Sequence, residues 1–240
     1  MGKVIGIIFS AAVGLTVLGC HFYQIVGSGK PVSNSYSIDG FDAVVFSHGC
    51  EATFEQADSF SVEVTIDDNL EEYVLVKEQG GKLTIGLESG HSYRTTLFSA
   101  RVKAPHFRLV EGSGGSTVQS IGTVVVSAPF AVDLSGGSEM KASAFTDDLN
   151  IRLSGGSRLI LNGSGGNLNL CVSGGGEAEM FDFDVNDCNA TLSGGSSAQI
   201  SASGVICGEL SGGSDLDYCG NAAVGSVQKS GGSTVERRCP

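Results

Sequence analysis

The chain has 240 residues, of which 36 are glycine and 4 are proline, and its formal charge is −12 at pH 7. The glycines do not recur at every third position, which excludes collagen, and apolar residues alternate with polar ones too regularly for a disordered chain. So acidic a chain is a poor candidate for binding nucleic acid through a basic patch. Because no long helical periodicity is present, the composition predicts an all-β protein.

Residues 1–20 have the pattern of a lipoprotein signal peptide. Lys3 supplies a positive charge, the apolar run Val4–Leu18 is short for a membrane span, and Cys20 follows where the run stops. This arrangement resembles a bacterial lipobox, in which the cysteine is lipidated. We therefore predict an exported protein that Cys20 anchors by lipid to a bacterial membrane, in our interpretation the outer one, facing the periplasm or the cell surface. Residues 21–34 are interpreted as a tether, and a secretory signal with a chance cysteine is the alternative.

Residues 35–110 are predicted to form an N-terminal β region. The alternation of apolar and polar side chains is clearest at residues 60–66 and 82–87, and a turn, a strand and another turn lie between them. The pattern leaves open whether this region forms the first coils of the repeat that follows or caps it as a separate small sheet.

Residues 111–240 repeat one short phrase, Ser-Gly-Gly-Ser or a close variant. Self-similarity at a period of about 19 residues is typical of a solenoid. Because the residues between phrases alternate with a period of two, each coil is expected to hold one strand before the phrase and one after it. We predict a right-handed parallel β-helix. The copies start at Ser113, Ser135, Ser154, Ser173, Ser193, Ser211 and Ser230.

Alternate positions of these strands are apolar in the successive copies. In a parallel β-helix, equivalent positions stack about 4.8 Å apart, so these side chains would form apolar ladders in the interior. The inward positions predicted next to the phrase, and five residues after its first serine, are Leu134, Leu153, Val172, Leu192, Leu210, Val118, Met140, Leu159, Ala178, Ala198, Leu216 and Val235.

The glycine phrase is predicted to be a corner between two inward-facing strands. Glycine adopts positive φ without strain, and the small serines can bond the backbone or the serine of the next coil. A phosphate-binding loop is excluded, because the phrase lacks the Lys-Ser/Thr pair and no helix follows it.

Opposite charges recur at outward positions of neighbouring coils. Glu139, Arg158 and Glu177 occupy equivalent places in three coils, and Asp133 and Arg152 do so in two. Stacked exposed pairs of this kind contribute about 0–1 kcal/mol each. A merely solvated face is the alternative, and neither interpretation implies catalysis.

Six cysteines remain besides Cys20, and an even number permits disulfides in an exported protein. Cys219 and Cys239 lie about one coil apart, so that a disulfide between them could staple the last coil. Cys188 and Cys207 have a similar spacing. No Cys/His zinc spacing is present, and no metal site is predicted.

An enzyme has to be considered, since many parallel β-helices cleave acidic polysaccharides with clustered carboxylates. Solvated loop acids are the preferred interpretation, and catalysis would need these acids to converge in a cleft beside Arg152 or Arg158. The spacing of His48 and Cys50 does not by itself predict a base and nucleophile pair. The acidic candidates are Asp147, Asp148, Asp182, Asp184, Asp187, Asp215 and Asp217.

Three pieces of sequence carry a resemblance to a known family: "SIDGFDAVVF", "VEVTIDDNLEEYVLVKEQGGKLTIGL" and the repeated "LSGGS". Over residues 36–235 the chain resembles the "putative auto-transporter adhesin, head GIN domain" family, which is widespread among exported proteins of Bacteroidetes. The resemblance implies a right-handed β-helix in the cell envelope and brings no catalytic motif. The adhesin label of that family is itself an analogy from fold.

We therefore expect a non-catalytic lipoprotein of the cell envelope, without a cofactor, whose solenoid surface binds a glycan or a protein. Its membrane contact would be the lipid anchor only, and homo-oligomerisation stays open. Two alternatives remain: a polysaccharide-active lyase or hydrolase, and a structural or assembly protein of the periplasm that pairs coils edge to edge.

Overall fold

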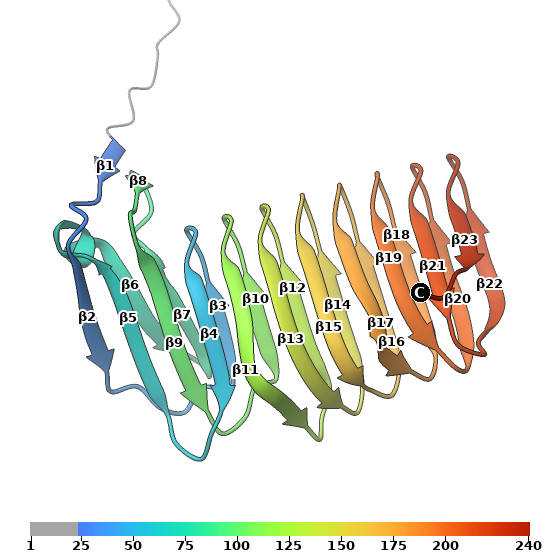
Figure 1. Ribbon diagram of the computed structural model, residues 1–240, viewed down its shortest axis with the longest axis horizontal. Coiled ribbons are helices and arrows are strands. Elements are labelled where there is room, and N and C mark those ends of the chain that lie inside the picture. Colours follow the sequence, from blue (N-terminus) through green and yellow to red (C-terminus); the bar gives the residue numbers. More distant parts are fainter. Residues whose placement is uncertain (1–23) are drawn as a thin grey trace, which may run out of the picture.

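The computed structural model describes residues 24–240, so the predicted signal peptide and Cys20 lie outside the described residues. Two long sheets enclose a common core in an elongated molecule, and the coils succeed one another along its long axis (Figure 1). A third, two-stranded sheet pairs β1 (Gln24–Val26) with β8 (Ser92–Arg94). The fold is the predicted all-β solenoid with stacked parallel coils.

The two long sheets share the strands of each coil between them. The eleven-stranded sheet has the order β2 (Pro31–Tyr36), β5 (Ser61–Asp67), β9 (Phe98–Ala104), β4 (Glu51–Gln56), β11 (Thr117–Val126), β13 (Glu139–Thr146), β15 (Arg158–Ser164), β17 (Glu177–Val185), β19 (Ser197–Ala202), β21 (Asp215–Cys219) and β23 (Thr234–Arg237). The ten-stranded sheet has the order β22 (Ala223–Lys229), β20 (Val205–Leu210), β18 (Cys188–Leu192), β16 (Leu168–Val172), β14 (Leu149–Leu153), β12 (Phe130–Leu134), β10 (Leu109–Gly112), β3 (Ala43–Phe46), β7 (Lys82–Leu87) and β6 (Val74–Gln79).

The register of the parallel strands confirms the apolar ladders. Val132 pairs with Ile151, which pairs with Leu170, and each of these side chains is buried. Of the inward positions named from the sequence, all are buried except Val235, which is half-buried in the last coil. One hydrophobic core therefore runs from Phe41 to Leu216 through both sheets.

The N-terminal β region belongs to the same two sheets and is not a separate one. β3 and β4 form a coil, and β7 and β9 lie in parallel on its outer side, while β10 and β11 continue the solenoid on its inner side. Beyond β7 and β9, the antiparallel strands β6, β5 and β2 close this end together with the 3-10 helix η1 (Asp68–Tyr73). The sequence left open whether this region forms the first coils or a cap. It does both: β3, β4, β7 and β9 belong to parallel coils, and β6, β5 and β2 cap them.

The expected tether over residues 21–34 is wrong for its described part, because residues 24–34 contain β1 and the start of β2. β2 pairs antiparallel with β5, and Val32 lies opposite Ile66. Proline is tolerated as the first residue of an edge strand, where its missing N–H faces no partner, so Pro31 does not prevent this pairing. Periodicity did not reveal this strand, because its sequence is polar and its partner residues lie 26 to 36 positions further along the chain.

The glycine corners behave as predicted and show why the first glycine of each phrase is needed. Its φ is positive in all seven copies, for example +78° at Gly194. Each corner also rests on the one before: a Cβ atom on Gly194 would lie 2.7 Å from the carbonyl oxygen of Gly174. Gly195 has no positive φ, and a Cβ atom there would lie 4.0 Å from the same oxygen.

The second serine of most phrases is buried and hydrogen-bonded. The hydroxyl of Ser138 donates to the carbonyl of Ser135 at 2.8 Å, and Ser157 and Ser154 repeat this bond at 2.7 Å. A hydroxyl without a partner at this position would be costly, whereas the bonded one closes the corner at no penalty.

Gly194→Ala should lower the free energy of unfolding by about 2 kcal/mol or more, because the new side chain meets both the positive φ and the Gly174 carbonyl. Gly195→Ala is the matched control and should change it by less than about 0.5 kcal/mol. Urea unfolding followed by circular dichroism measures both. Equal effects of the two substitutions would contradict this account of the corner.

Asp67 fastens the N-terminal segment to the solenoid. Its carboxylate is buried at the end of β5 and accepts hydrogen bonds from the backbone N–H of Gly29 and of Thr96, both at 2.8 Å, and from the Thr96 hydroxyl. Burial alone would raise the pKa of Asp67, but the hydrogen bonds from Thr96, Gly29 and Leu97 outweigh it and hold the pKa below its ordinary value.

Because the folded-state pKa of Asp67 is lowered, its contribution to stability is complete above the unfolded-state pKa of about 4 and is lost as the pH falls through the folded value. Asp67→Asn should cost about 1–3 kcal/mol at pH 7. The difference between the two proteins should shrink as the pH falls below about 4. Urea unfolding at pH 7, 5 and 3 measures it, and a difference independent of pH would be inconsistent with a charged Asp67.

Candidate functional site

The outer face of the eleven-stranded sheet is a long regular surface that no helix of residues 24–240 covers (Figure 1). Its outward side chains form rows across the strands, because each strand keeps the register of its neighbour. One row contains Arg101, Thr53, Gln119 and Lys141. Solenoids commonly use such faces as extended binding surfaces.

Towards the C-terminal end of this face, polar side chains bind one another. Arg158 forms ion pairs with Glu177, at 3.6 Å, and with Glu179. The predicted pairing is thus observed between Arg158 and Glu177. On the other sheet, Asp133 and Arg152 stand in register, but no ion pair joins them in the described part of the chain.

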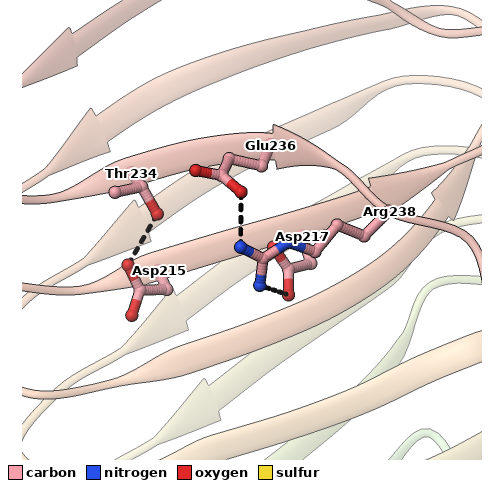
Figure 2. A network of polar contacts seen from close by, with 5 residues as sticks. All are labelled: Asp215, Asp217, Thr234, Glu236 and Arg238. Carbon is pink, nitrogen blue, oxygen red and sulfur yellow. Dashed lines mark hydrogen bonds and ion pairs between the residues drawn. The ribbon is translucent and has the colours of Figure 1, made fainter.

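Figure 2 shows the same self-pairing in the last two coils, on β21 and β23. The Thr234 hydroxyl donates to the carboxylate of Asp215 at 2.6 Å. Arg238 lies between two acids, 2.5 Å from Glu236 and 3.5 Å from Asp217. These five side chains occupy one another's hydrogen-bonding groups, so this end of the face offers few unused ones.

The N-terminal end of the same face is hollowed at two adjoining places. One hollow, of ≈ 390 Å³, lies over β9, β4 and β11. The other, of ≈ 480 Å³, lies over β5, β9 and β4 and reaches Ile121 on β11. Thr53 and Arg101 line both hollows and lie opposite each other in register, so the hollows meet along this pair.

The polar side chains around these hollows are not paired with each other. Within residues 24–240, Glu51, Thr53, Glu63, Arg101 and Gln119 take part in no side-chain hydrogen bond or ion pair, and the Thr53 hydroxyl is buried without any partner. Lys103 and Glu55 at the margin do pair, at 2.8 Å. We call the unpaired set the open patch: Glu51, Thr53, Glu63, Arg101 and Gln119.

The acidic side chains that an enzyme would need serve elsewhere. Asp148 accepts the backbone N–H of Asn167 at 2.9 Å, and Asp187 accepts that of Val205 at 2.7 Å. Each of these carboxylates fixes the second turn of the next coil. Asp147 is exposed in such a turn. These acids therefore lie in separate turns, where Asp148 and Asp187 hydrogen-bond the backbone, and they are not gathered at one place.

The remaining acids are equally dispersed. Asp184 accepts the Ser201 hydroxyl at 2.7 Å, and Asp182 is exposed on the same strand. Asp184 is seven residues along β17 from Glu177, the partner of Arg158, which corresponds to about 20 Å. Among the residues that the structure describes, no three His, Cys, Asp or Glu side chains gather closely enough to hold a metal ion.

His48 and Cys50 do not form a base and nucleophile pair. His48 is exposed, with Nδ1 2.9 Å from the Ser47 hydroxyl, and partial desolvation of the ring lowers its pKa. Cys50 is buried, and burial, with Glu51 beside it, raises the pKa of its thiol to about 12. A nucleophilic cysteine needs its thiolate, which this environment disfavours.

Both residues belong instead to a corner that sequence reasoning missed. Phe46 pairs with Gly112 and Glu51 with Thr117, so Ser47–Cys50 stacks on the first Ser-Gly-Gly-Ser phrase. His48 accordingly has a positive φ of 62°, and Cys50 takes the buried position of the second serine. The spacing Ser-x-Gly-x ahead of an alternating strand was the available signal.

The structure joins the sulfurs of Cys219 and Cys239, with their Cα atoms 4.9 Å apart. Cys188 and Cys207 are not bonded to each other: Cys188 pairs with Ile206 in the core, whereas Cys207 pairs with Asn189, which is exposed. Burial raises the pKa of Cys188 to about 12, with Cys207 contributing less. Cys171 is exposed.

Counting thiols tests both sequence predictions for cysteine. The denatured, unreduced protein purified from membranes should show four thiols per chain: Cys50, Cys171, Cys188 and Cys207. A fifth would mean that Cys20 is unmodified, and two more would mean that Cys219 and Cys239 are reduced. Under native conditions the exposed Cys171 should react first. Intact-mass measurement after alkylation distinguishes these cases.

None of the helices among residues 24–240 is long and apolar enough to cross a membrane. No curated protein matches the chain significantly.

Solved structures share this fold over most of their length. A "putative adhesin" from Bacteroides fragilis superposes with a TM-score of 0.82 at 16% identity, covering 89% of this chain and 100% of its own. A "putative adhesin" from Parabacteroides merdae gives 0.69 at 23% identity, covering 90% and 99%. A "putative lipid binding protein" from Parabacteroides distasonis gives 0.71 at 17% identity, covering 90% and 100%. At these identities the likeness shows the fold alone.

The family model of the "putative auto-transporter adhesin, head GIN domain" matches residues 40–222. That span begins just before β3 and ends just before β22, so it includes most of the solenoid and the whole open patch. The chain therefore belongs to the putative auto-transporter adhesin, head GIN domain family.

Proposed function

We propose that this protein is a non-catalytic, adhesin-like binding module of the bacterial cell envelope. In this proposal Cys20 carries the lipid anchor, and the outer face of the eleven-stranded sheet binds a glycan or a protein. The single observation that carries the proposal is the open patch beside its two hollows, because unpaired polar groups on a rigid surface are available to a ligand.

The comparisons support an adhesin-like role. The family is named for an adhesin head, and two structures of the same fold are described as adhesins. The neighbour described as lipid binding gives a weaker argument, because the space between the sheets here is filled by buried side chains and charged side chains stand in the lining of both hollows. A polar surface site fits a hydrophilic ligand better than an acyl chain.

The enzyme alternative has less support. Of the acids that the sequence singled out, Asp147 and Asp182 are exposed and the others bind turns, hydroxyl groups or Arg238. The ion-pair partners of Arg158 are two other acids, Glu177 and Glu179. The assembly alternative would use the sheet edges, and sedimentation at several protein concentrations would detect it.

The test of the proposed location is antibody labelling of intact and permeabilised cells that express the full chain. Labelling of intact cells is the expected result, because an adhesin-like module has to meet its ligand outside the cell. A Cys20→Ser variant should leave the membrane fraction, since it removes the atom that would carry the lipid.

Labelling only after permeabilisation would overturn the adhesin-like role and favour a periplasmic one. Retention of Cys20→Ser in the membrane fraction would overturn the lipid anchor. A known periplasmic protein, labelled in parallel, controls for leakage of the intact cells.

A further inference from the structure

We propose that the open patch binds a neutral saccharide, in the two hollows that meet at Thr53 and Arg101. This inference rests on the proposed function, because it names the ligand class for the same surface.

The hydrogen-bonding chemistry of the patch matches that of sugar hydroxyl groups. A hydroxyl both donates and accepts, and the patch supplies both complements: Glu51 and Glu63 accept, Arg101 donates, and Gln119 does both. Arg101 lies in register between Glu63 on β5 and Thr53 on β4. Neighbouring strands are about 4.8 Å apart, so these groups can reach different hydroxyl groups of one sugar ring or of two linked rings.

The open patch differs from the rest of the same face because its charged side chains form no ion pairs within the described residues. Arg158 and Arg238 each contact acidic side chains, whereas Arg101 has Glu63 opposite it and forms no ion pair within residues 24–240. Thr53 lines both hollows, and its buried hydroxyl has no hydrogen-bond partner within the described residues.

The local charge favours a neutral ligand over an acidic one. Three carboxylates, of Glu51, Glu55 and Glu63, stand among the two cations Arg101 and Lys103. Glu55 and Lys103 neutralise each other at 2.8 Å, which leaves two acids around Arg101. A uronate or sulfate group would meet these carboxylates, and the chain as a whole carries a charge of −12.

The volumes of the two hollows and an apolar side chain in their lining also suit a saccharide. Volumes of ≈ 390 and ≈ 480 Å³ lie within the range of ordinary ligand sites. Ile121, at the far end of the second hollow, is 49% exposed and offers an apolar contact to the C–H face of a sugar ring. The strands beneath are fixed by ladders on both sides, so the patch does not need ordering when a ligand binds.

The experiment is a glycan array probed with the full chain purified in detergent. The array carries neutral oligosaccharides and matched versions that bear uronate or sulfate groups. Neutral glycans should be retained, and titration of the best one by calorimetry then gives its Kd. Arg101→Ala and Gln119→Ala should each weaken that binding about tenfold, as expected for the loss of well-placed hydrogen bonds.

Two substitutions on the same face serve as matched controls. Gln199→Ala removes the glutamine that is equivalent to Gln119 on β19, and Arg158→Ala removes a paired arginine. Both should leave the Kd within about twofold of the original value. Circular dichroism and thermal unfolding of all four variants show whether each is folded.

The outcomes separate this inference from the proposed function. Binding that depends on Arg101 and Gln119 and prefers neutral glycans supports both. Preference for acidic glycans, or binding that the two substitutions leave unchanged, overturns the saccharide site but keeps a binding module. The absence of binding to any glycan overturns the saccharide site, and a periplasmic location in the labelling experiment overturns the adhesin-like role independently.

Discussion

Backbone hydrogen bonds between successive coils set the spacing on which the rest of this molecule depends. The N–H of Ser154 donates to the carbonyl of Leu134 at 2.9 Å, and the N–H of Ser173 repeats the bond to Leu153 at the same distance. Strands held this closely leave little room for a Cβ atom where corner meets corner, as at Gly194, and this spacing adds to the positive φ in favouring glycine at the start of the corner. The same constraint aligns the apolar ladders inside and the polar rows outside.

A fixed spacing also decides which polar groups are available for a ligand. Where neighbouring coils place opposite charges or hydroxyl groups in one row, they satisfy each other, as Arg158 and Glu177 do. At the antiparallel pair β5 and β9 the repeat is broken, and there Glu63 and Arg101 lie opposite each other in register without forming an ion pair. The open patch extends from this pair onto the neighbouring parallel strands β4 and β11. Regular coils therefore supply rigidity, and the irregular end holds the polar side chains that stay unpaired within the described residues.

Much of the solenoid could be predicted from the sequence, because its contacts are local in the repeat: Leu153 is buried for the same reason as Leu134 one coil earlier. The N-terminal end could not, because its contacts are not periodic. Val32 pairs with Ile66 on β5, and the sequence around Val32 contains no pattern that predicts this partner. The open patch was missed for a related reason. Alternation predicts that Arg101 faces outward, but pairing depends on side-chain distances that alternation does not contain.

Because residues 24–36 contain the strands β1 and β2, little chain is left between Cys20 and the folded part to act as a spacer. Between Cys20 and Gln24, four Cα–Cα steps span at most about 14 Å. A lipid on Cys20 would thus hold the strand β1 within that distance of the bilayer surface. The strands β5, β9 and β4, which carry most of the open patch, lie at the same end of the molecule as β1 (Figure 1). Such a protein cannot extend its binding face away from the membrane like a fibre tip. It would meet ligands that come to the membrane, such as polymers of the cell's own envelope or chains long enough to penetrate to it.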